Sequence, residues 1–172
     1  MRCWSVPMVL AITAFACTTD SPETSHGAQM VVNAVNALGE SVGFLEARPG
    51  LPQALWRSAS GVLIYLGALP GGSRSSAVAI DDAGTIVGQS ETGRGEFRAV
   101  RWRHGAIEDL GTLPGGDFSV ASAIDGGAVL GESDAGDGML HAFRWQDGRM
   151  TDLGRFSPAA ASGGPPPRPD RR

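Results

Sequence analysis

The stretch Leu110-Gly111-Thr112-Leu113-Pro114-Gly115-Gly116 decides the fold, because it has a near copy at Leu66-Gly67-Ala68-Leu69-Pro70-Gly71-Gly72. The two copies begin 44 residues apart. A third copy begins at Asp152-Leu153-Gly154, and there the pattern gives way to Arg155-Phe156-Ser157-Pro158. Recurrence at this spacing is typical of repeat architectures, in which each unit packs against the next. We expect this stretch to be the joint between successive units.

Between the joints, apolar residues and glycines recur as a strand, a tight turn and a second strand. The segment 34–43 aligns with 79–88, and also with 123–131, which is one residue shorter at the turn. A short polar side chain that bonds the backbone two residues on, followed by a glycine that accepts positive φ, is typical of such turns. Each turn has this pair: Asn36 with Gly39, Asp81 with Gly84, and Asp125 with Gly127.

A third, aromatic strand follows in each unit. Ala99-Val100-Arg101-Trp102 aligns with Ala142-Phe143-Arg144-Trp145, and we align Gln53-Ala54-Leu55-Trp56 with both. Alternation places the tryptophan and the apolar residue two positions before it on one face, with the arginine on the other. We expect the tryptophans to pack between units. Turns at Gly61, Gly105 and Gly148 then lead to fourth strands at 62–66, 106–110 and 149–153.

Four short strands in about 44 residues predict an all-β fold of three four-stranded antiparallel blades, β-propeller-like and open or partial. The predicted β domain spans residues 30–157, with units at about 31–72, 76–116 and 120–156. Small residues in the opening strands (Ala77, Ala79, Ala121, Ala123) suit an inner position, where blades crowd together. Because three units are few for a closed ring, we expect exposed blade faces at both ends, which favour self-association or marginal stability.

The chain begins with a segment that is typical of an export signal, residues 1–16. Arg2 provides a positive charge, residues 9–16 an apolar run, and Ala14-Phe15-Ala16 a cleavage site of the small-x-small type. Cys17 follows directly and resembles the acylated cysteine of a bacterial lipoprotein, with 17–29 as a polar tether. Secretion without lipidation, or no export, are the alternatives. Residues 158–172 are predicted to be a disordered tail rich in Pro and Arg.

Composition and motifs indicate binding rather than catalysis. The net charge is −4 and all 14 basic residues are Arg, so we expect neither nucleic-acid binding nor a P-loop. Ser90 and Ser133 recur at equivalent positions, which favours a structural role over a nucleophilic one. We therefore expect no enzyme activity, no catalytic residues and no cofactor.

Charged and metal-ligating residues give weak signals. His26, His104 and His141 lack metal-ligand spacing. The loop 133–138 offers oxygens that suit Ca²⁺, but it lacks the full calcium-loop pattern, so we expect no metal site. Two cross-strand ion pairs are expected within blades: Arg101 with Asp109, and Arg144 with Asp152.

These motifs resemble the HAF family of probable extracellular repeats. His141-Ala142-Phe143-Arg144-Trp145 carries that family's name motif intact, and Arg98-Ala99-Val100-Arg101-Trp102 departs from it at two positions. The strand motifs Ile86–Ser90 and Val129–Ser133 also match, as does the joint at 110–116 with an inserted proline. The resemblance covers roughly 31–156. It implies export and a repeat β-fold, but no known activity and no functional residues.

The sequence therefore predicts an exported binding or interaction module, either an outer-membrane or periplasmic lipoprotein or an extracellular protein. Its partner would be a protein or a polysaccharide, contacted through the loops 91–96 and 134–140. Membrane contact would come only through a lipid on Cys17. The alternatives are a structural or self-assembling envelope protein that uses open blade faces, and a truncated fragment of a longer repeat array.

Overall fold

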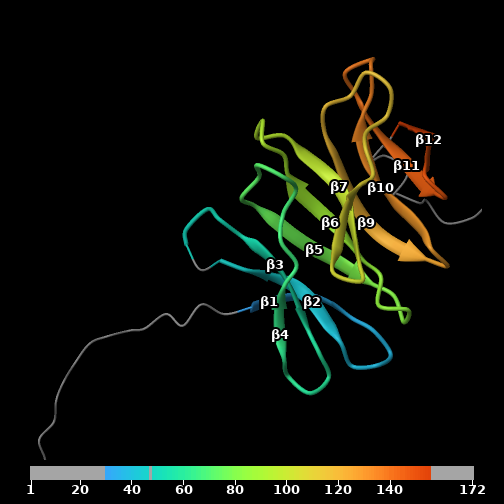
Figure 1. The fold of residues 1–172 in the computed structure, drawn as a ribbon. Coiled ribbons are helices and arrows are strands. Elements are labelled where there is room, and N and C mark those ends of the chain that lie inside the picture. The colour runs from blue at the N-terminus through green and yellow to red at the C-terminus, as the bar shows by residue number, and fades with distance from the viewer. Residues whose placement is uncertain (1–29, 47, 156–172) are drawn as a thin grey trace, which may run out of the picture.

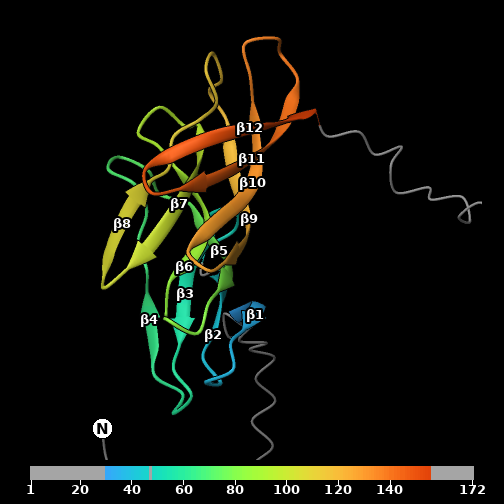
Figure 2. The same ribbon diagram turned by 90° about the vertical axis from the view of Figure 1, so that its right-hand side faces the viewer.

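The structure is a computed structural model that describes residues 30–46 and 48–155. All regular elements in these residues are β-strands, arranged as three antiparallel sheets that lie side by side without closing (Figures 1 and 2). The expected all-β architecture of three four-stranded blades is therefore confirmed. The predicted signal, Cys17, the tether and the tail lie outside the described residues.

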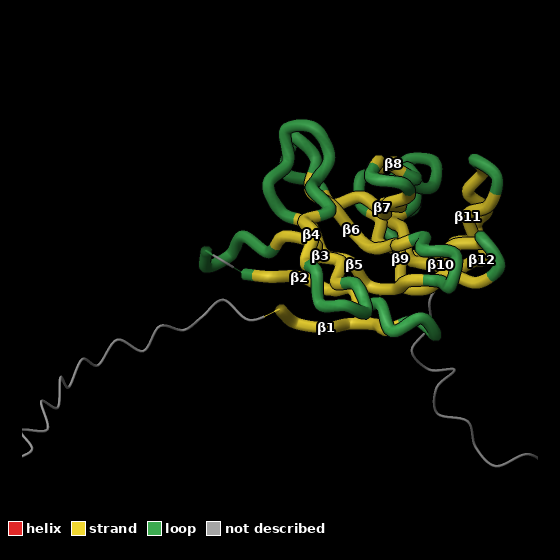
Figure 3. The backbone as a smooth tube through the Cα atoms, turned by 60° about the horizontal axis from the view of Figure 1, so that its bottom comes forward, coloured by secondary structure: helices red, strands yellow, loops and turns green. Residues whose placement is uncertain are grey.

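Each blade is an up-and-down meander whose strands are neighbours in sequence order (Figure 3). Blade 1 contains β1 (Met30–Val35), β2 (Ser41–Leu45), β3 (Gln53–Arg57) and β4 (Leu63–Tyr65). Blade 2 contains β5 (Ser75–Ile80), β6 (Ile86–Glu91), β7 (Phe97–Arg103) and β8 (Ala106–Asp109). Blade 3 contains β9 (Ser119–Asp125), β10 (Ala128–Asp134), β11 (Leu140–Gln146) and β12 (Arg149–Arg155).

The first strand of a blade is the one that meets its predecessor. Strand β5 packs against β1, β2 and β3, and β9 packs against β5, β6 and β7. Ala77 on β5 and Ala121 on β9 are buried in these contacts, as the small residues of the opening strands predicted, whereas Ala79 is half-buried and Ala123 is exposed. An alanine there brings the backbones of two sheets close together, because its side chain fills so little space.

A glycine on the second strand of each blade lies opposite an irregularity in the first strand. The pairing of β5 with β6 shifts between Ala77 and Ala79, and β1 with β2 shifts between Val32 and Ala34. A Cβ on Gly88 would collide with the carbonyl oxygen of Ser76, and a Cβ on Gly43 with that of Val31. The β-bulge in the first strand therefore requires glycine at this position of the second strand, directly after apolar residues such as Ile86 and Val87.

Two apolar cores fill the spaces between neighbouring blades. Each core combines side chains from the second strand, the third strand and the joint of one blade with side chains from the first three strands of the next, including its tryptophan. The core between blades 1 and 2 contains Val42, Ala54, Leu69, Ala77, Ile80, Ile86, Val100 and Trp102. The core between blades 2 and 3 contains Val87, Ala99, Leu110, Leu113, Ala121, Val129, Phe143 and Trp145. Trp102 and Trp145 thus pack between blades, as expected.

The alignment of the first unit's third strand is wrong by one residue. Gly43 pairs with Leu55, and Gly88 pairs with Val100, so Leu55 is the counterpart of Val100. Trp56 therefore occupies the position of Arg101, and Arg57 occupies the position of Trp102. The sequence alignment matched Trp56 with Trp102 because both are tryptophans. The pairing of Gly43 with Leu55 sets the register, and a shift of one residue moves a side chain to the opposite face of the sheet.

The joints at 66–72 and 110–116 are held by a buried leucine and by their paired glycines. Leu69 and Leu113 insert into the two apolar cores. The paired glycines lie against the next loop, where a Cβ on Gly71 would stand 2.8 Å from the Cα of Gly93. In the following unit the amide of Gly136 donates to the carbonyl of Pro114 at 3.0 Å. The loops 91–96 and 134–140, which we expected to contact a ligand, thus pack against the joints on one side.

Four buried serines, two in blade 2 and two in blade 3, hydrogen-bond to the blade or joint that precedes them in the chain. Ser75 Oγ accepts from Ala54 N at 3.0 Å, and Ser119 Oγ accepts from Ala99 N at 2.8 Å. Ser90 Oγ and Ser133 Oγ accept from the joint amides Leu69 N and Leu113 N at 2.8 and 2.9 Å. Because the fastened amides are buried, these hydrogen bonds satisfy donors that would otherwise lose water without compensation. Ser90 and Ser133 therefore have structural partners.

We expect Ser119→Ala to lower the free energy of unfolding by about 1–3 kcal/mol, because it leaves the Ala99 amide buried without an acceptor. The matched control is Ser122→Ala on the same strand, where an exposed serine is expected to change stability by less than about 0.5 kcal/mol. Urea denaturation followed by tryptophan fluorescence measures both. Equal effects of the two substitutions would contradict the role of the serine as a fastening.

Candidate functional site

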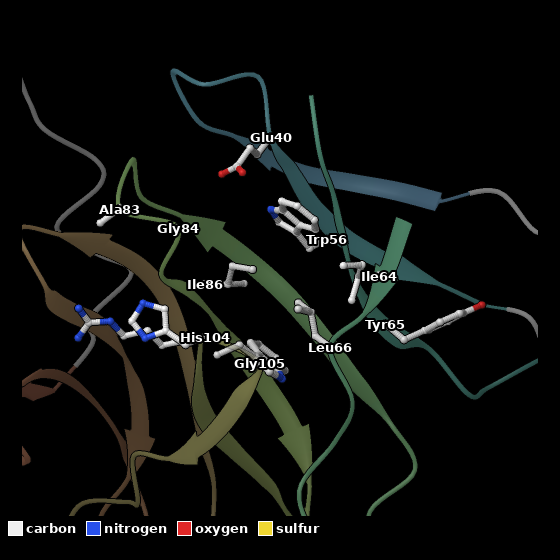
Figure 4. A pocket seen from close by; sticks show the side chains of 12 residues that line it. Glu40, Trp56, Ile64, Tyr65, Leu66, Ala83, Gly84, Ile86, His104 and Gly105 are labelled. Carbon is white, nitrogen blue, oxygen red and sulfur yellow. The ribbon is translucent and has the colours of Figure 1, made fainter. Parts of the chain in front are cut away.

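A pocket of about 390 Å³ opens between blades 1 and 2, and we call it the inter-blade pocket (Figure 4). Blade 1 and blade 2 both contribute to its walls, and the turns at one end of the two blades form its rim. Its lining residues are Glu40, Trp56, Ile64, Tyr65, Leu66, Ala83, Gly84, Ile86, Trp102, Arg103, His104 and Gly105. Clefts of this size between packed elements are where small ligands bind most often.

The walls of the pocket are apolar and largely aromatic. Trp56, Ile64 and Leu66 come from the β3–β4 side of blade 1, and Figure 4 shows them facing Ile86 of blade 2 across the opening. Trp102 lines the pocket from β7 and is 2 % exposed, whereas Trp56 is half-buried. An aromatic wall that remains open to solvent offers stacking area without first having to displace other protein groups.

Charged and polar residues lie around the rim. Glu40, Arg103 and His104 bring a carboxylate, a guanidinium and an imidazole to the pocket. His104 stands at the tip of the β7–β8 hairpin with φ of 51°, and Gly105 follows with φ of 78°. Two consecutive residues with positive φ are typical of the tight hairpin turn that follows the right-handed twist of the strands.

The two turns at one end of the pocket are bonded to each other across the blade boundary. The Asn36 side chain donates from Nδ2 to Glu40 Oε2 at 2.8 Å and to the Asp81 carbonyl at 3.1 Å. The Ala37 amide donates to Asp82 Oδ1 at 2.9 Å. The polar turn residues that the repeat pattern singled out therefore also join neighbouring blades, which fixes the position of Glu40 at the rim.

The equivalent place between blades 2 and 3 is filled. There the Arg101 guanidinium lies over the indole of Trp145, 4.6 Å from the ring centroid. Glu108, opposite Arg101 in the strand pairing, accepts from its Nε at 3.0 Å and holds it in place. In blade 1 these two positions are Trp56 and Ile64, so no ion pair covers the tryptophan of the next blade. The pocket exists because this pair is exchanged.

Both expected cross-strand ion pairs are wrong. The register places Arg101 opposite Glu108, and Asp109 instead accepts from the Gly111 amide at 2.8 Å. Arg144 lies opposite Thr151, and Asp152 bonds to His141. In an antiparallel pair only directly opposed residues share a face at close range, so a one-residue difference in register exchanges the partner.

Trp102 contributes an unpaired donor. Its indole Nε1 is buried, and among the described residues it has no hydrogen-bond partner. A buried donor without an acceptor costs about 1–3 kcal/mol, so an oxygen that reached it would recover that free energy. The sequence contained no signal for this feature, because the burial of one indole edge depends on how two blades pack.

A polar cluster on blade 3 joins the β10–β11 loop to β12. His141 Nδ1 lies 2.8 Å from Asp152 Oδ2, and His141 Nε2 lies 3.3 Å from Asp137 Oδ2. Arg155 Nη2 also bonds Asp137, at 2.9 Å. The hydrogen bond to Asp152 raises the pKa of His141, and Asp137 raises it further. The Gly154 amide lowers the pKa of Asp152, with His141 adding to this effect.

Carboxylates of the loop 133–138, which offered oxygens that suit Ca²⁺, bond backbone amides. Asp134 Oδ1 accepts from the Phe118 amide at 2.8 Å, and Asp137 Oδ1 accepts from the Met139 amide at 3.0 Å. Within residues 30–46 and 48–155, no group of three or more His, Cys, Asp or Glu side chains is arranged to hold a metal ion. Asp134 therefore bonds the segment after the joint, and Asp137 bonds its own turn as well as His141 and Arg155.

Glu91 fixes the base of the other loop, 91–96. It accepts from Arg74 Nη2 at 2.7 Å and from the Ser73 amide at 3.1 Å. The Arg74 guanidinium is the largest cause that lowers the pKa of Glu91 to about 2, with the Ser73 amide next. The Arg74 guanidinium also lies 4.9 Å from the centre of the Phe97 ring. Glu91 thus bonds the start of this loop to the segment that follows the joint.

No protein-family model matches the chain, and searches of curated proteins and of solved structures found no match. No helix in the described part of the chain is long and apolar enough to cross a membrane.

We expect Asp152→Asn to lower the pKa of His141, measured by NMR titration of its ring protons. The raised pKa means that the pairing stabilises the fold fully below about pH 6.5, and that this contribution disappears as pH rises through the folded-state pKa. The two aspartates, whose pKa values are lowered, lose their contribution only as pH falls below about 3.8.

Stability of the wild type should therefore fall more than that of Asp152→Asn as pH rises above about 6.5. Asp147→Asn is the control, because Asp147 is exposed at the tip of the same hairpin and makes no contact with His141 in the described structure. An unchanged His141 titration in Asp152→Asn would contradict the pairing.

Proposed function

We propose that the chain is an exported binding or interaction module, without catalysis, that acts on the cell surface or outside the cell. The observation that carries this proposal is the inter-blade pocket, where Trp56 remains partly open to solvent beside the buried Trp102, while the equivalent space between blades 2 and 3 is filled by Arg101 and Glu108. The space between blades 1 and 2 is open, and the equivalent space between blades 2 and 3 is filled. The packing of the blades does not by itself require this difference.

The chemistry of the pocket favours a ligand with an apolar face and a polar edge. A pyranose ring has this character, since its C–H face can lie on an indole while its hydroxyls reach the rim groups Glu40, Arg103 and His104. Among the two partner classes expected from the sequence, these features favour a polysaccharide over a protein.

Export is supported by the sequence of residues 1–16 and by the resemblance to the HAF family. Cys17, directly after the cleavage motif, is the residue that we propose for lipidation, and a lipid there would place the blades at a membrane surface. A simple secreted form remains the alternative. Mass spectrometry of the mature N-terminus distinguishes the two, because acylation adds the mass of the lipid to Cys17.

A structural or self-assembling envelope protein is the second candidate function. The specific observation in its favour is that apolar residues are exposed on both end blades, including Val35 at 62 % and Leu63 at 53 % on blade 1 and Leu153 at 55 % on blade 3. This candidate requires assembly that increases with protein concentration in the absence of any ligand. Sedimentation velocity over a hundredfold range of concentration provides that measurement.

The double substitution Trp56→Arg with Ile64→Glu recreates the filled arrangement of the second interface. We expect it to retain the fold and to weaken polysaccharide binding at least tenfold, because an Arg–Glu pair would cover Trp102 as it covers Trp145. Chitohexaose, cellohexaose and maltohexaose are the probes, and isothermal titration calorimetry together with the change in tryptophan fluorescence is the measurement.

The matched control is Arg101→Trp with Glu108→Ile, which opens the second interface in the same way and leaves the inter-blade pocket untouched. It should bind the same oligosaccharide as the wild type, and a second binding site is expected if the exchange alone creates a pocket. The proposed site would be wrong if the first double variant bound an oligosaccharide as tightly as the wild type. The proposed ligand class would be wrong if none of the three oligosaccharides bound the wild type.

A further inference from the structure

The outer face of blade 3 keeps the residues that are buried on the corresponding faces of blades 1 and 2. Strand pairing makes Val42, Val87 and Leu130 equivalent, and these are 0 %, 0 % and 41 % exposed. It also makes Ala142 the counterpart of Ala99. Ala99 is 0 % exposed, whereas Ala142 is half-buried. At the joint, Leu110 is 6 % exposed and its counterpart Leu153 is 55 % exposed. Blade 3 thus presents to solvent a face that elsewhere is covered.

An arginine completes this face. Arg101 of blade 2 stacks on Trp145, the tryptophan supplied by the following blade. Its counterpart on blade 3 is Arg144, which is exposed and lies opposite Thr151. A guanidinium over an indole is attracted by the negative face of the ring, and the attraction is stronger when water is excluded. Arg144 therefore has the position and the chemistry to receive one more indole.

We propose that the outer face of blade 3 is a docking surface for a β-blade of a partner repeat chain, whose third strand presents a tryptophan to Arg144. The two interfaces within this chain show what such a face accepts: the tryptophan, the apolar second strand and the small first strand of the next blade. The partner's first strand would begin with a serine that accepts from the Ala142 amide, as Ser119 accepts from Ala99.

A second copy of this chain does not fit the same role. The face that it would offer is the outer face of blade 1, where Arg57 stands in the position of Trp102 and would meet Arg144 with like charge. Ser41 stands in the position of Ile86, and Met30 in the position of the fastening Ser75. The two open ends are thus chemically different, and blade 3 alone retains the repeat's inter-blade chemistry.

This surface is separate from the inter-blade pocket, so it is tested without any ligand. The probe is a donor form of the full chain with Ser41→Ile and Arg57→Trp, which gives blade 1 the inserting residues of blade 2, and with Leu130→Asp, which disables its own blade 3 face. Wild type serves as the receiver. We expect a 1:1 complex of donor and wild type in sedimentation velocity, while neither associates alone.

The matched receiver is Arg144→Glu, which changes one exposed side chain and is expected to fold as the wild type does. It should bind the donor at least tenfold more weakly, because the cation over the indole is lost and a carboxylate meets the aromatic face. If Ser41→Ile prevents folding, the donor carries Arg57→Trp and Leu130→Asp only, and the same ratio is expected from a weaker complex.

Absence of a complex with the wild type, or equal binding to Arg144→Glu, would overturn the proposal. Association of the wild type alone that Arg144→Glu abolishes would identify a second copy as the occupant instead. A complex that forms only after deletion of residues 156–172 would identify the chain's own terminal segment as the occupant. None of these outcomes bears on oligosaccharide binding at the inter-blade pocket.

Discussion

The structure depends on one contact, the packing of a blade's tryptophan face onto the small-residue face of the blade before it. Sheets of four short strands bury little on their own, and the two apolar cores lie between blades rather than within one. The serine hydrogen bonds, the inserted leucine of each joint and the stacked Arg101 all act at this boundary. The pocket between blades 1 and 2 is a local variation of the same boundary, in which two side chains have been exchanged.

Much of the fold could be predicted because the repeat puts the same constraints at the same spacing. The joint at 110–116, the turn glycines and the alternation around Trp102 each depend on backbone geometry or period, which are properties of local sequence. The third strand of the first unit could not be aligned correctly from the sequence, since its Trp56-Arg57 order reverses that of Arg101-Trp102. Only the pairing of Gly43 with Leu55 reveals which face each residue occupies.

The candidate site was less accessible to sequence reasoning for the same reason. The pocket results from Trp56 and Ile64 standing where Arg101 and Glu108 stand in the next unit, and that equivalence depends on a register that sequence similarity misassigned. In the loops 91–96 and 134–140, which the sequence predicts as ligand contacts, Glu91 accepts from the Ser73 amide and Asp137 from the Met139 amide. These bonds depend on how the loops fold against neighbouring segments, which the sequence pattern does not contain.

The serine at the start of each later blade acts backwards along the chain: Ser75 satisfies an amide of blade 1, and Ser119 satisfies one of blade 2. A blade therefore cannot complete its own hydrogen bonding until the first strand of the next unit has been made. Blade 1 needs residue 75, and blade 2 needs residue 119, before these buried amides are satisfied. Each new unit therefore completes the hydrogen bonding of the unit before it.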